Sequence, residues 1–231
     1  MYFRNLFEPL SIEGLEARNR LVLPGMHTNL GGEEEGIRED GKDFAIARAE
    51  GGFGMVSVGI IDSYPWDFTS EDDYHLSTER HVQNHTEVSS AIKDEGAIPY
   101  AQIGPRRVWP LGEVFSGDHQ LSELESETIE EMIDATIETA VLAEEAGYEA
   151  VDLLGNGAGA ISFFMSSRFN DRTDEWGGDL TAQTRFPRKI IEGIRKETDL
   201  PVFFRLIGHE FLDDGYGTET IAKMAKDLEE A

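Results

Sequence analysis

Cysteine is absent from the 231-residue chain. Its absence excludes disulfide bonds, thiolate nucleophiles, and cysteine-ligated zinc or iron–sulfur clusters within this chain. No run of about 18 apolar residues occurs either, and Glu8, Glu13 and Glu16 interrupt the N-terminal segment, so we expect neither a secretory signal nor a membrane span. A cytoplasmic location is the resulting expectation.

Basic residues are scarce: 20 Lys and Arg face 46 Asp and Glu, for a net charge of -26. Nucleic acids and anionic membranes need a positive surface, so neither is expected as a partner. The acidic residues form either a binding face or a surface adapted to a high-salt cytosol. Their even spread favours the second interpretation, because about 1 M salt shortens the Debye length to about 3 Å and screens such repulsion.

Repeats, low-complexity stretches and linkers are also lacking, and 39% of the residues are hydrophobic. A chain of this length can bury a sizeable core. We therefore expect residues 1–231 to form a single domain.

Strand and helix patterns alternate along the chain. Buried strands are predicted at 19–25, 53–61, 97–104, 148–154 and 202–208. Helices are predicted at 42–50, at 79–95, from an N-cap at Ser126 to Gly147, at 181–197, and from a cap at Thr218 onward. Five such units indicate a parallel sheet covered by helices, as an open doubly wound sheet or a (β/α)8 barrel. A barrel would be truncated after about five units.

The stretch DLLGNGAGAIS (152–162) follows the fourth strand with three closely spaced glycines. Glycines after a strand let backbone N–H groups approach a phosphate, as in dinucleotide-binding motifs. The spacing disfavours that interpretation, because Ala160 stands where the third glycine is needed. We also expect a polar loop, not a helix, after the glycines.

Three segments carry a family resemblance: NLFEPLSIEGLEARNRLVLPGMHTN (5–29), SRFNDRTDEWGGDLTAQTRF (167–186) and FFRL (203–206). Together they resemble the old yellow enzyme family of FMN-dependent NADH:flavin oxidoreductases, nearest to the branch of 2,4-dienoyl-CoA reductase and trimethylamine dehydrogenase. The resemblance is colinear over nearly the whole chain. It implies a TIM-type (β/α)8 barrel with flavin at the C-terminal ends of the strands. The family's phosphate site follows strands seven and eight, beyond the five units predicted here.

Carried over by position, the resemblance implies a flavin site at the ends of four strands. Glycine after the first strand permits close backbone approach to the ring. A buried glutamine amide needs hydrogen-bond partners, and a lone arginine in an apolar strand needs a negative one, both of which a flavin provides. The implied cofactor-binding residues are Pro24, Gly25, Met26, His27, Gly59, Gln102 and Arg205.

Alternatives remain for three of these residues. Gly59 is explained equally by tight packing, and Arg205 by a salt bridge across the barrel mouth. His27 is either a flavin or a substrate contact.

The positions that correspond to the family's catalytic residues carry no ionisable side chain in this chain. Leu154 and Gly157 stand at the substrate-anchoring pair, and Gly159 stands at the proton-donating tyrosine. Arg106 or Arg107 either replaces a family histidine in the third-strand loop or faces solvent. The catalytic residues are therefore unknown. The resemblance implies structural roles for Arg172, Asp174, Trp176, Gly177, Gly178 and Arg185.

The histidines predict no metal site. Only His81 and His85 share a helical i, i+4 spacing, which we interpret as an exposed helix face. The spacing of His75, His119 and His209 suits no metal ligand set.

The resemblance implies hydride transfer from NAD(P)H through FMN to an activated alkene of enoate or dienoyl type, or amine oxidation, with a small-molecule substrate. The alternative is a non-catalytic, truncated or degenerate barrel fragment or subunit with weak or no flavin binding. Unclosed strands leave exposed edges, so a homo-oligomer or a second chain completing the barrel is expected.

Overall fold

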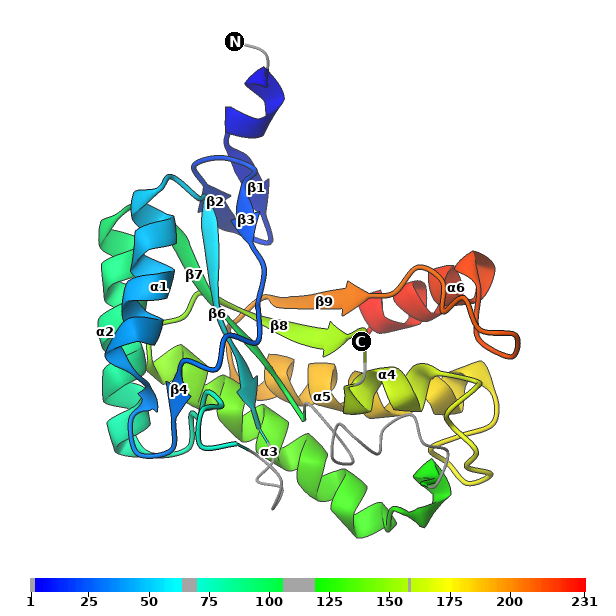
Figure 1. The fold of residues 1–231 in the computed structure, drawn as a ribbon. Coiled ribbons are helices and arrows are strands. Elements are labelled where there is room, and N and C mark those ends of the chain that lie inside the picture. The colour runs from blue at the N-terminus through cyan, green and yellow to red at the C-terminus, as the bar shows by residue number, and fades with distance from the viewer. Residues whose placement is uncertain (1–2, 64–69, 106–118, 158) are drawn as a thin grey trace.

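A five-stranded parallel sheet forms the centre of the molecule in this computed structural model, which describes residues 3–63, 70–105, 119–157 and 159–231 (Figure 1). The strand order is β3-β6-β7-β8-β9, so each strand of this sheet lies beside the strand that precedes it along the chain. The strands are β3 (Val22–Leu23), β6 (Met55–Asp62), β7 (Ile98–Gly104), β8 (Ala150–Gly155) and β9 (Val202–Leu206).

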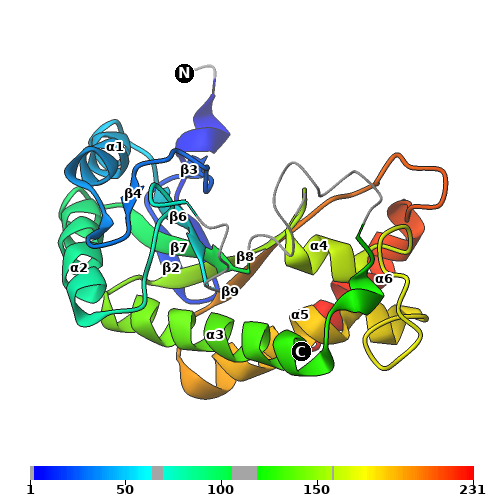
Figure 2. The ribbon, with the colours of Figure 1, turned by 60° about the horizontal axis from the view of Figure 1, so that its bottom comes forward.

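Helices follow the strands and cover one face of the sheet. Viewed toward the bottom of the molecule, they lie in an arc around it (Figure 2). The long helices are α1 (Glu39–Glu50), α2 (Glu79–Asp94), α3 (Ser126–Glu145), α5 (Leu180–Glu197) and α6 (Thr218–Glu229). The curled sheet with its outer helices is a half-barrel, which confirms the predicted truncated TIM-type fold.

Burial differs along the sheet. Every residue of β6 and β7 is buried, whereas every residue of β9 is half-buried. Strands covered on both faces become continuous apolar runs, and an edge strand does not. Within the described residues, no strand pairs with the outer edge of β3 or of β9.

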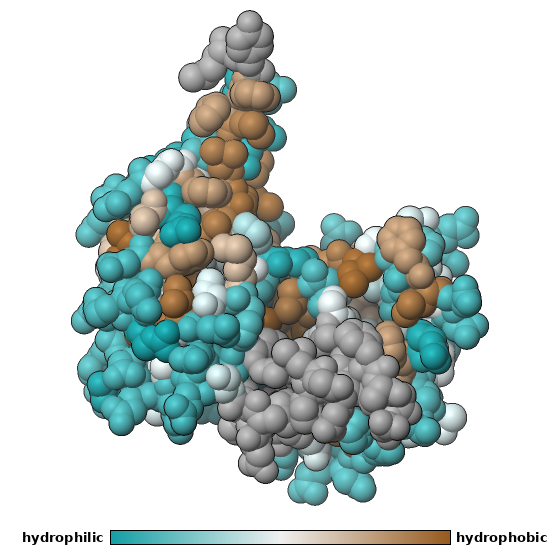
Figure 3. Space-filling view, viewed as in Figure 1, coloured by the Kyte–Doolittle hydropathy of each residue, from teal (hydrophilic) through white to brown (hydrophobic). Residues whose placement is uncertain are grey.

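A short antiparallel hairpin, β1 (Leu10–Ile12) and β2 (Leu15–Ala17), closes one end of the half-barrel. Its Ala17 packs with Met55, Ile98 and Ala150, which stand at the beginnings of β6, β7 and β8. The parallel strands finish at the opposite end, and the candidate site lies there. Before the hairpin, the 3-10 helix η1 (Arg4–Phe7) exposes apolar side chains, visible as brown in Figure 3.

The predicted elements are largely confirmed, with corrections at their ends. Gly147, predicted to end the third helix, has a positive φ of 81° directly after the C-cap of α3. The caps at Ser126 and Thr218 were wrong: each is the first residue of its helix, after Glu125 and Gly217 respectively, and no side chain caps either helix.

Several short elements were not predicted, and one predicted strand is shorter than expected. The expected polar loop after the glycines is wrong, because α4 (Ala160–Met165) begins there and all six residues are buried. The predicted first strand, 19–25, is reduced to the two residues of β3. A second hairpin, β4 (Gly31–Gly32) and β5 (Gly36–Ile37), lies between β3 and α1.

The exposed helix face predicted for His81 and His85 is also wrong. Both side chains are buried. His85 Nδ1 lies 2.7 Å from the Tyr148 hydroxyl and its Nε2 lies 3.1 Å from the His75 carbonyl oxygen. Burial lowers the pKa of His85 to about 3, so the imidazole is neutral.

No described helix combines the length and apolar character needed to cross a membrane.

Candidate active site

The predicted flavin residues gather where the parallel strands end. Gly25 follows β3, Gly59 lies in β6 and Gln102 in β7. A Cβ on Gly25 would collide with Gln102 Oε1, and one on Gly59 would lie 2.7 Å from the Gln102 carbonyl oxygen. Met26 N–H donates to the Gly59 carbonyl oxygen at 3.2 Å. Only glycine fits at both positions, so tight packing alone accounts for Gly59, which has a φ of 117°.

A buried carboxylate that the sequence analysis missed links two predicted residues. Gln102 Nε2 donates to Asp152 Oδ2 at 2.5 Å, and Arg205 Nη2 donates to the same oxygen at 3.2 Å. The Asp152 side chain is 7% exposed and that of Arg205 is 29% exposed. The salt bridge expected as the alternative for Arg205 is therefore present, between neighbouring strands.

Strand register brings these three side chains to one face. Gln102 pairs directly with Asp152 across β7 and β8, and Asp152 pairs with Phe203 across β8 and β9. Arg205 follows Phe203 by two residues, and residues two apart point to the same face. The sequence did contain a signal for this ion pair: Asp152 is an acidic residue within the apolar strand that neighbours the strand of Arg205.

Burial raises the pKa of Asp152, and the hydrogen bonds from Gln102 and Arg205 act against that shift. Tyr100, two residues before Gln102, donates its hydroxyl to the Leu23 carbonyl oxygen at 2.9 Å. Burial, with a contribution from the Asp152 charge, raises the pKa of Tyr100 to about 12. Tyr100 therefore stays protonated and ties β7 to β3. We call Gln102, Asp152 and Arg205, with Tyr100 beneath them, the floor of the site.

The residues around Gly25 alternate in exposure. Pro24, Met26 and His27 are exposed while Gly25 is buried. His27 Nδ1 lies 3.7 Å from a carboxylate oxygen of the buried Asp73. The segment thus presents an exposed ridge beside the floor.

The glycine stretch after β8 forms a tight turn. A Cβ on Gly155 would collide with the Phe204 ring, so that position needs glycine for packing. Gly157 is exposed with a φ of 72°, and a Cβ there would meet no atom within 4 Å. Ser162 Oγ donates to the carbonyl oxygens of Gly157 and Gly159, each at 2.7 Å. We call residues 154–157 and Gly159 the rim.

The residues to which the resemblance assigns structural roles, in the loop 172–178 and at Arg185, make contacts with the surrounding protein. Arg172 donates to the carbonyl oxygens of Leu121 and Leu124 at 2.8 and 2.7 Å. It also forms a forked pair with Asp174, whose pKa it lowers. Trp176 is fully buried, and Arg185 Nη1 lies 3.5 Å from a carboxylate oxygen of Glu175. Arg106 and Arg107 lie outside the described residues.

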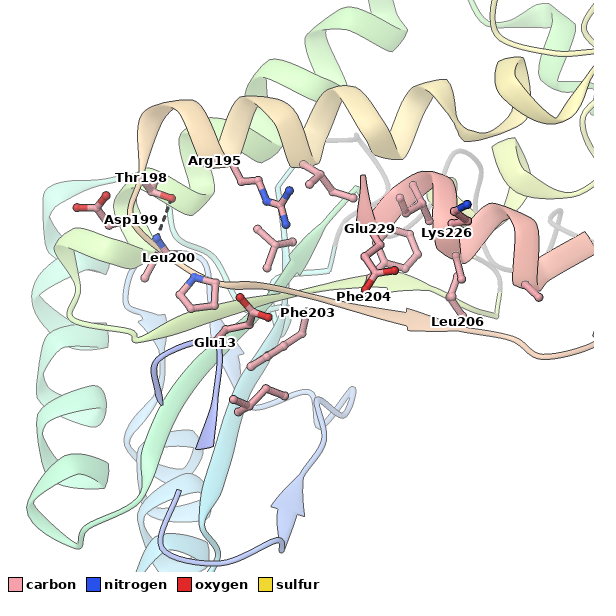
Figure 4. Close-up of a pocket in the computed structure, with 17 residues that line it drawn as sticks. Glu13, Arg195, Thr198, Asp199, Leu200, Phe203, Phe204, Leu206, Lys226 and Glu229 are labelled. Carbon is pink, nitrogen blue, oxygen red and sulfur yellow. Dashed lines mark hydrogen bonds between the residues drawn. The ribbon is translucent and has the colours of Figure 1, made fainter. Parts of the chain in front are cut away.

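A cavity of about 890 Å³ lies away from the floor, along the outer side of β9. Side chains of β9, α5 and α6 line it, among them Phe204, Arg195 and Glu229 (Figure 4). It therefore belongs to the uncovered sheet edge. Among the described residues, no cluster of His, Asp and Glu side chains is suited to hold a metal ion.

The curled parallel sheet, with helices on one face and a polar floor at the strand ends, defines a partial (β/α) barrel. The NADH:flavin oxidoreductase / NADH oxidase family model matches residues 5–231, so the chain belongs to that family. The family and its named relatives imply FMN and NAD(P)H as cofactors.

Two curated relatives illustrate the likeness. The NADH oxidase of Thermoanaerobacter brockii is 32% identical over 100% of this chain, which covers 38% of that protein. The NADPH dehydrogenase of Bacillus subtilis (strain 168) is 26% identical over 92% of this chain, which covers 66% of it. The chain thus spans less than two thirds of both.

Solved structures show the same fold. A 2-naphthoyl-CoA reductase in complex with 2-naphthoyl-CoA superposes with a TM-score of 0.87 and 27% identity, over 100% of this chain and 39% of that chain. An old yellow enzyme homologue from Zymomonas mobilis has a TM-score of 0.80 and 18% identity, over 97% of this chain and 71% of that chain. The second likeness concerns the fold alone.

The floor fits one edge of a flavin. Gln102 packs directly against Gly25, and Gln102 and Arg205 bring an amide and a cation to the same place. A flavin edge carries donor and acceptor groups that match such a set.

Proposed function

We propose that this chain supplies the flavin-ring site of an FMN-dependent oxidoreductase that transfers hydride from NAD(P)H to an activated alkene. The observation that carries the proposal is the Gln102–Asp152–Arg205 cluster beside two obligatory glycines. FMN would accept a hydride from the nicotinamide and release it to the substrate.

Each floor residue has a defined task. Gln102 binds the polar edge of the ring, and Arg205 supplies positive charge near flavin N1. Gly25 and Gly59 allow Gln102 to pack close to the strand ends, and the backbone of 24–27 would lie along the ring. Because the chain spans only part of its relatives, we propose that the FMN phosphate is held by residues outside it.

The rim favours a bulky, flat substrate. Leu154, Gly157 and Gly159 carry no ionisable group, and no atom of the described residues lies within 4 Å of where a Gly157 Cβ would be. Proton transfer then relies on water or on a residue outside the rim. NAD(P)H and an amine both deliver a hydride to the flavin, whereas an activated alkene accepts one together with a proton, so a flavin reduced by NAD(P)H favours alkene reduction over amine oxidation.

The second candidate function is that of a non-catalytic barrel fragment or subunit. It is favoured by the unpaired outer edges of β3 and β9 in the described part of the chain. Such edges pair with another strand, so a second copy or another chain would complete the sheet.

Turnover by the FMN-loaded chain separates the two candidates. The protein, kept in high salt, is reduced anaerobically with NADH or NADPH and then mixed with an enoyl substrate, while a separate sample with oxidised FMN is mixed with a secondary amine. Recovery of the oxidised flavin spectrum on adding the alkene supports the proposed reaction. A reduced spectrum unchanged by any alkene, in protein that retains FMN, favours the non-catalytic candidate.

A further inference from the structure

We propose that Asp152 is a positioning residue that fixes the amide orientation of Gln102 and balances the charge of Arg205 at the flavin site. This inference rests on the proposed function. Its basis is one carboxylate oxygen, Asp152 Oδ2, that accepts from both side chains at 2.5 and 3.2 Å.

The carboxylate decides which end of the Gln102 amide faces the cofactor. An ionised carboxylate only accepts hydrogen bonds, so the NH2 group of Gln102 must point to Asp152. The amide oxygen then lies on the side of Gly25, where a Cβ would collide with it. The reversed amide would place two oxygen acceptors against each other in a buried site, which is costly. Gln102 therefore presents an acceptor toward the segment that follows β3.

The same carboxylate sets the charge that a flavin would experience. Arg205 is always protonated, and its guanidinium shares Asp152 Oδ2 with Gln102. Tyr100, beside Asp152 on β7, stays neutral because burial raises its pKa to about 12. Removing the negative charge of Asp152 would leave Arg205 uncompensated. An uncompensated cation near N1 favours the reduced, anionic flavin.

The matched control is Asp227, a carboxylate in an ion pair outside the floor. Its Oδ1 lies 2.9 Å from Arg188 Nη1, between α5 and α6. Asp227→Asn removes one partner of an ion pair, as Asp152→Asn does, but touches no floor residue.

The first measurement is the flavin midpoint potential of the wild-type chain and of the Asp152→Asn, Asp152→Glu and Asp227→Asn variants. Asp152→Asn should shift the reduction equilibrium at least tenfold toward reduced flavin, or about 30 mV for a two-electron couple. Asp152→Glu should restore most of the shift, and Asp227→Asn should cause none. An unchanged potential in Asp152→Asn, or an equal shift in Asp227→Asn, would overturn the charge-balancing role.

The second measurement needs no cofactor. The side-chain NH2 signals of Gln102, followed by NMR in ¹⁵N-glutamine-labelled apoprotein, should move in Asp152→Asn and stay in place in Asp227→Asn. If Asp152→Asn does not fold, the Asp152→Asn/Arg205→Gln double variant removes both charges and is read in the same way. Unchanged Gln102 signals overturn the positioning role. Failure of the wild-type chain to bind FMN would instead overturn the proposed function, while these signals would still decide the role of Asp152.

Discussion

The floor and the rim differ although both include residues of β8. On the floor, the Asp152 carboxylate is buried and holds two polar side chains from neighbouring strands. On the rim, Leu154 and Gly157 carry no ionisable group, and within the described part of the chain no atom lies within 4 Å of a Gly157 Cβ. In barrel enzymes the strands hold the scaffold while the loops beyond them determine the chemistry. The comparison supports our proposal that the floor binds the flavin ring and that the rim determines which substrate reaches it.

The largest effect should come from breaking the floor. Arg205→Met leaves the buried Asp152 carboxylate without its cation. Losing one partner of a fully buried pair costs about 3–5 kcal/mol, and the partial exposure of Arg205 reduces our expectation to about 2–3 kcal/mol. Urea unfolding in high salt measures the change. Arg188→Met, at an ion pair outside the floor, is the control, and an equal loss in both variants would contradict the account.

The second prediction compares the FMN affinities of two glycine variants, one on the floor and one on the rim. Gly25→Ala should weaken FMN binding at least tenfold, because the new methyl group collides with the Gln102 amide. Gly157→Ala should change FMN affinity less than twofold, because its methyl group meets no atom within 4 Å. The positive φ of Gly157 adds a folding cost of about 1 kcal/mol. Flavin fluorescence titration measures both affinities, and similar losses would remove the distinction.

The third prediction tests whether the rim lacks a proton donor, by introducing one. Gly159→Tyr places a phenol at the position of the family's tyrosine and should raise the rate of alkene reduction about 100-fold, the low end for general acid catalysis. Stopped-flow reoxidation of the reduced flavin by the alkene measures the rate. Gly159→Phe is the control without the hydroxyl. Equal rates in the two variants would show that the rim does not lack a proton donor.

The smallest effect concerns His85, away from the floor. Its pKa is lowered to about 3, so as the pH falls below about 6.5 the unfolded chain takes up a proton that the folded chain does not. The free energy of unfolding then falls by up to about 1.4 kcal/mol per pH unit. His85→Gln removes this term.

The stability difference between the wild type and His85→Gln should therefore narrow by about 1 kcal/mol between pH 6.5 and 5.5. Urea unfolding at both pH values in high salt measures it. A difference that is constant with pH would contradict the assignment of a neutral, buried His85. The sign is opposite for Asp152, whose raised pKa means that acid converts it to the form that burial favours.

The sequence was sufficient to predict the elements whose structure depends on neighbouring residues in the chain. Gly147 marked the end of α3, and the apolar runs marked the strands. It was insufficient where a contact joins distant residues. His85 is buried because Tyr148, 63 residues away, meets its ring, and the helical spacing alone gave no sign of that contact.

Asp152 was missed for the same reason. Its partners lie on two neighbouring strands, 50 and 53 residues away, and only the register brings them together. The short apolar helix α4 was missed because six residues are too few to show a helical period. The candidate flavin residues came from a resemblance, whereas the network that holds two of them required the structure.

The most direct test is a visible absorption spectrum of the chain purified in high salt, titrated with FMN and then with NADH under anaerobic conditions. We expect bound flavin with an absorption band at about 450 nm, and this band should bleach when NADH is added. A folded protein that binds neither FMN nor riboflavin, which carries no phosphate, would contradict the claim that its floor is a flavin site.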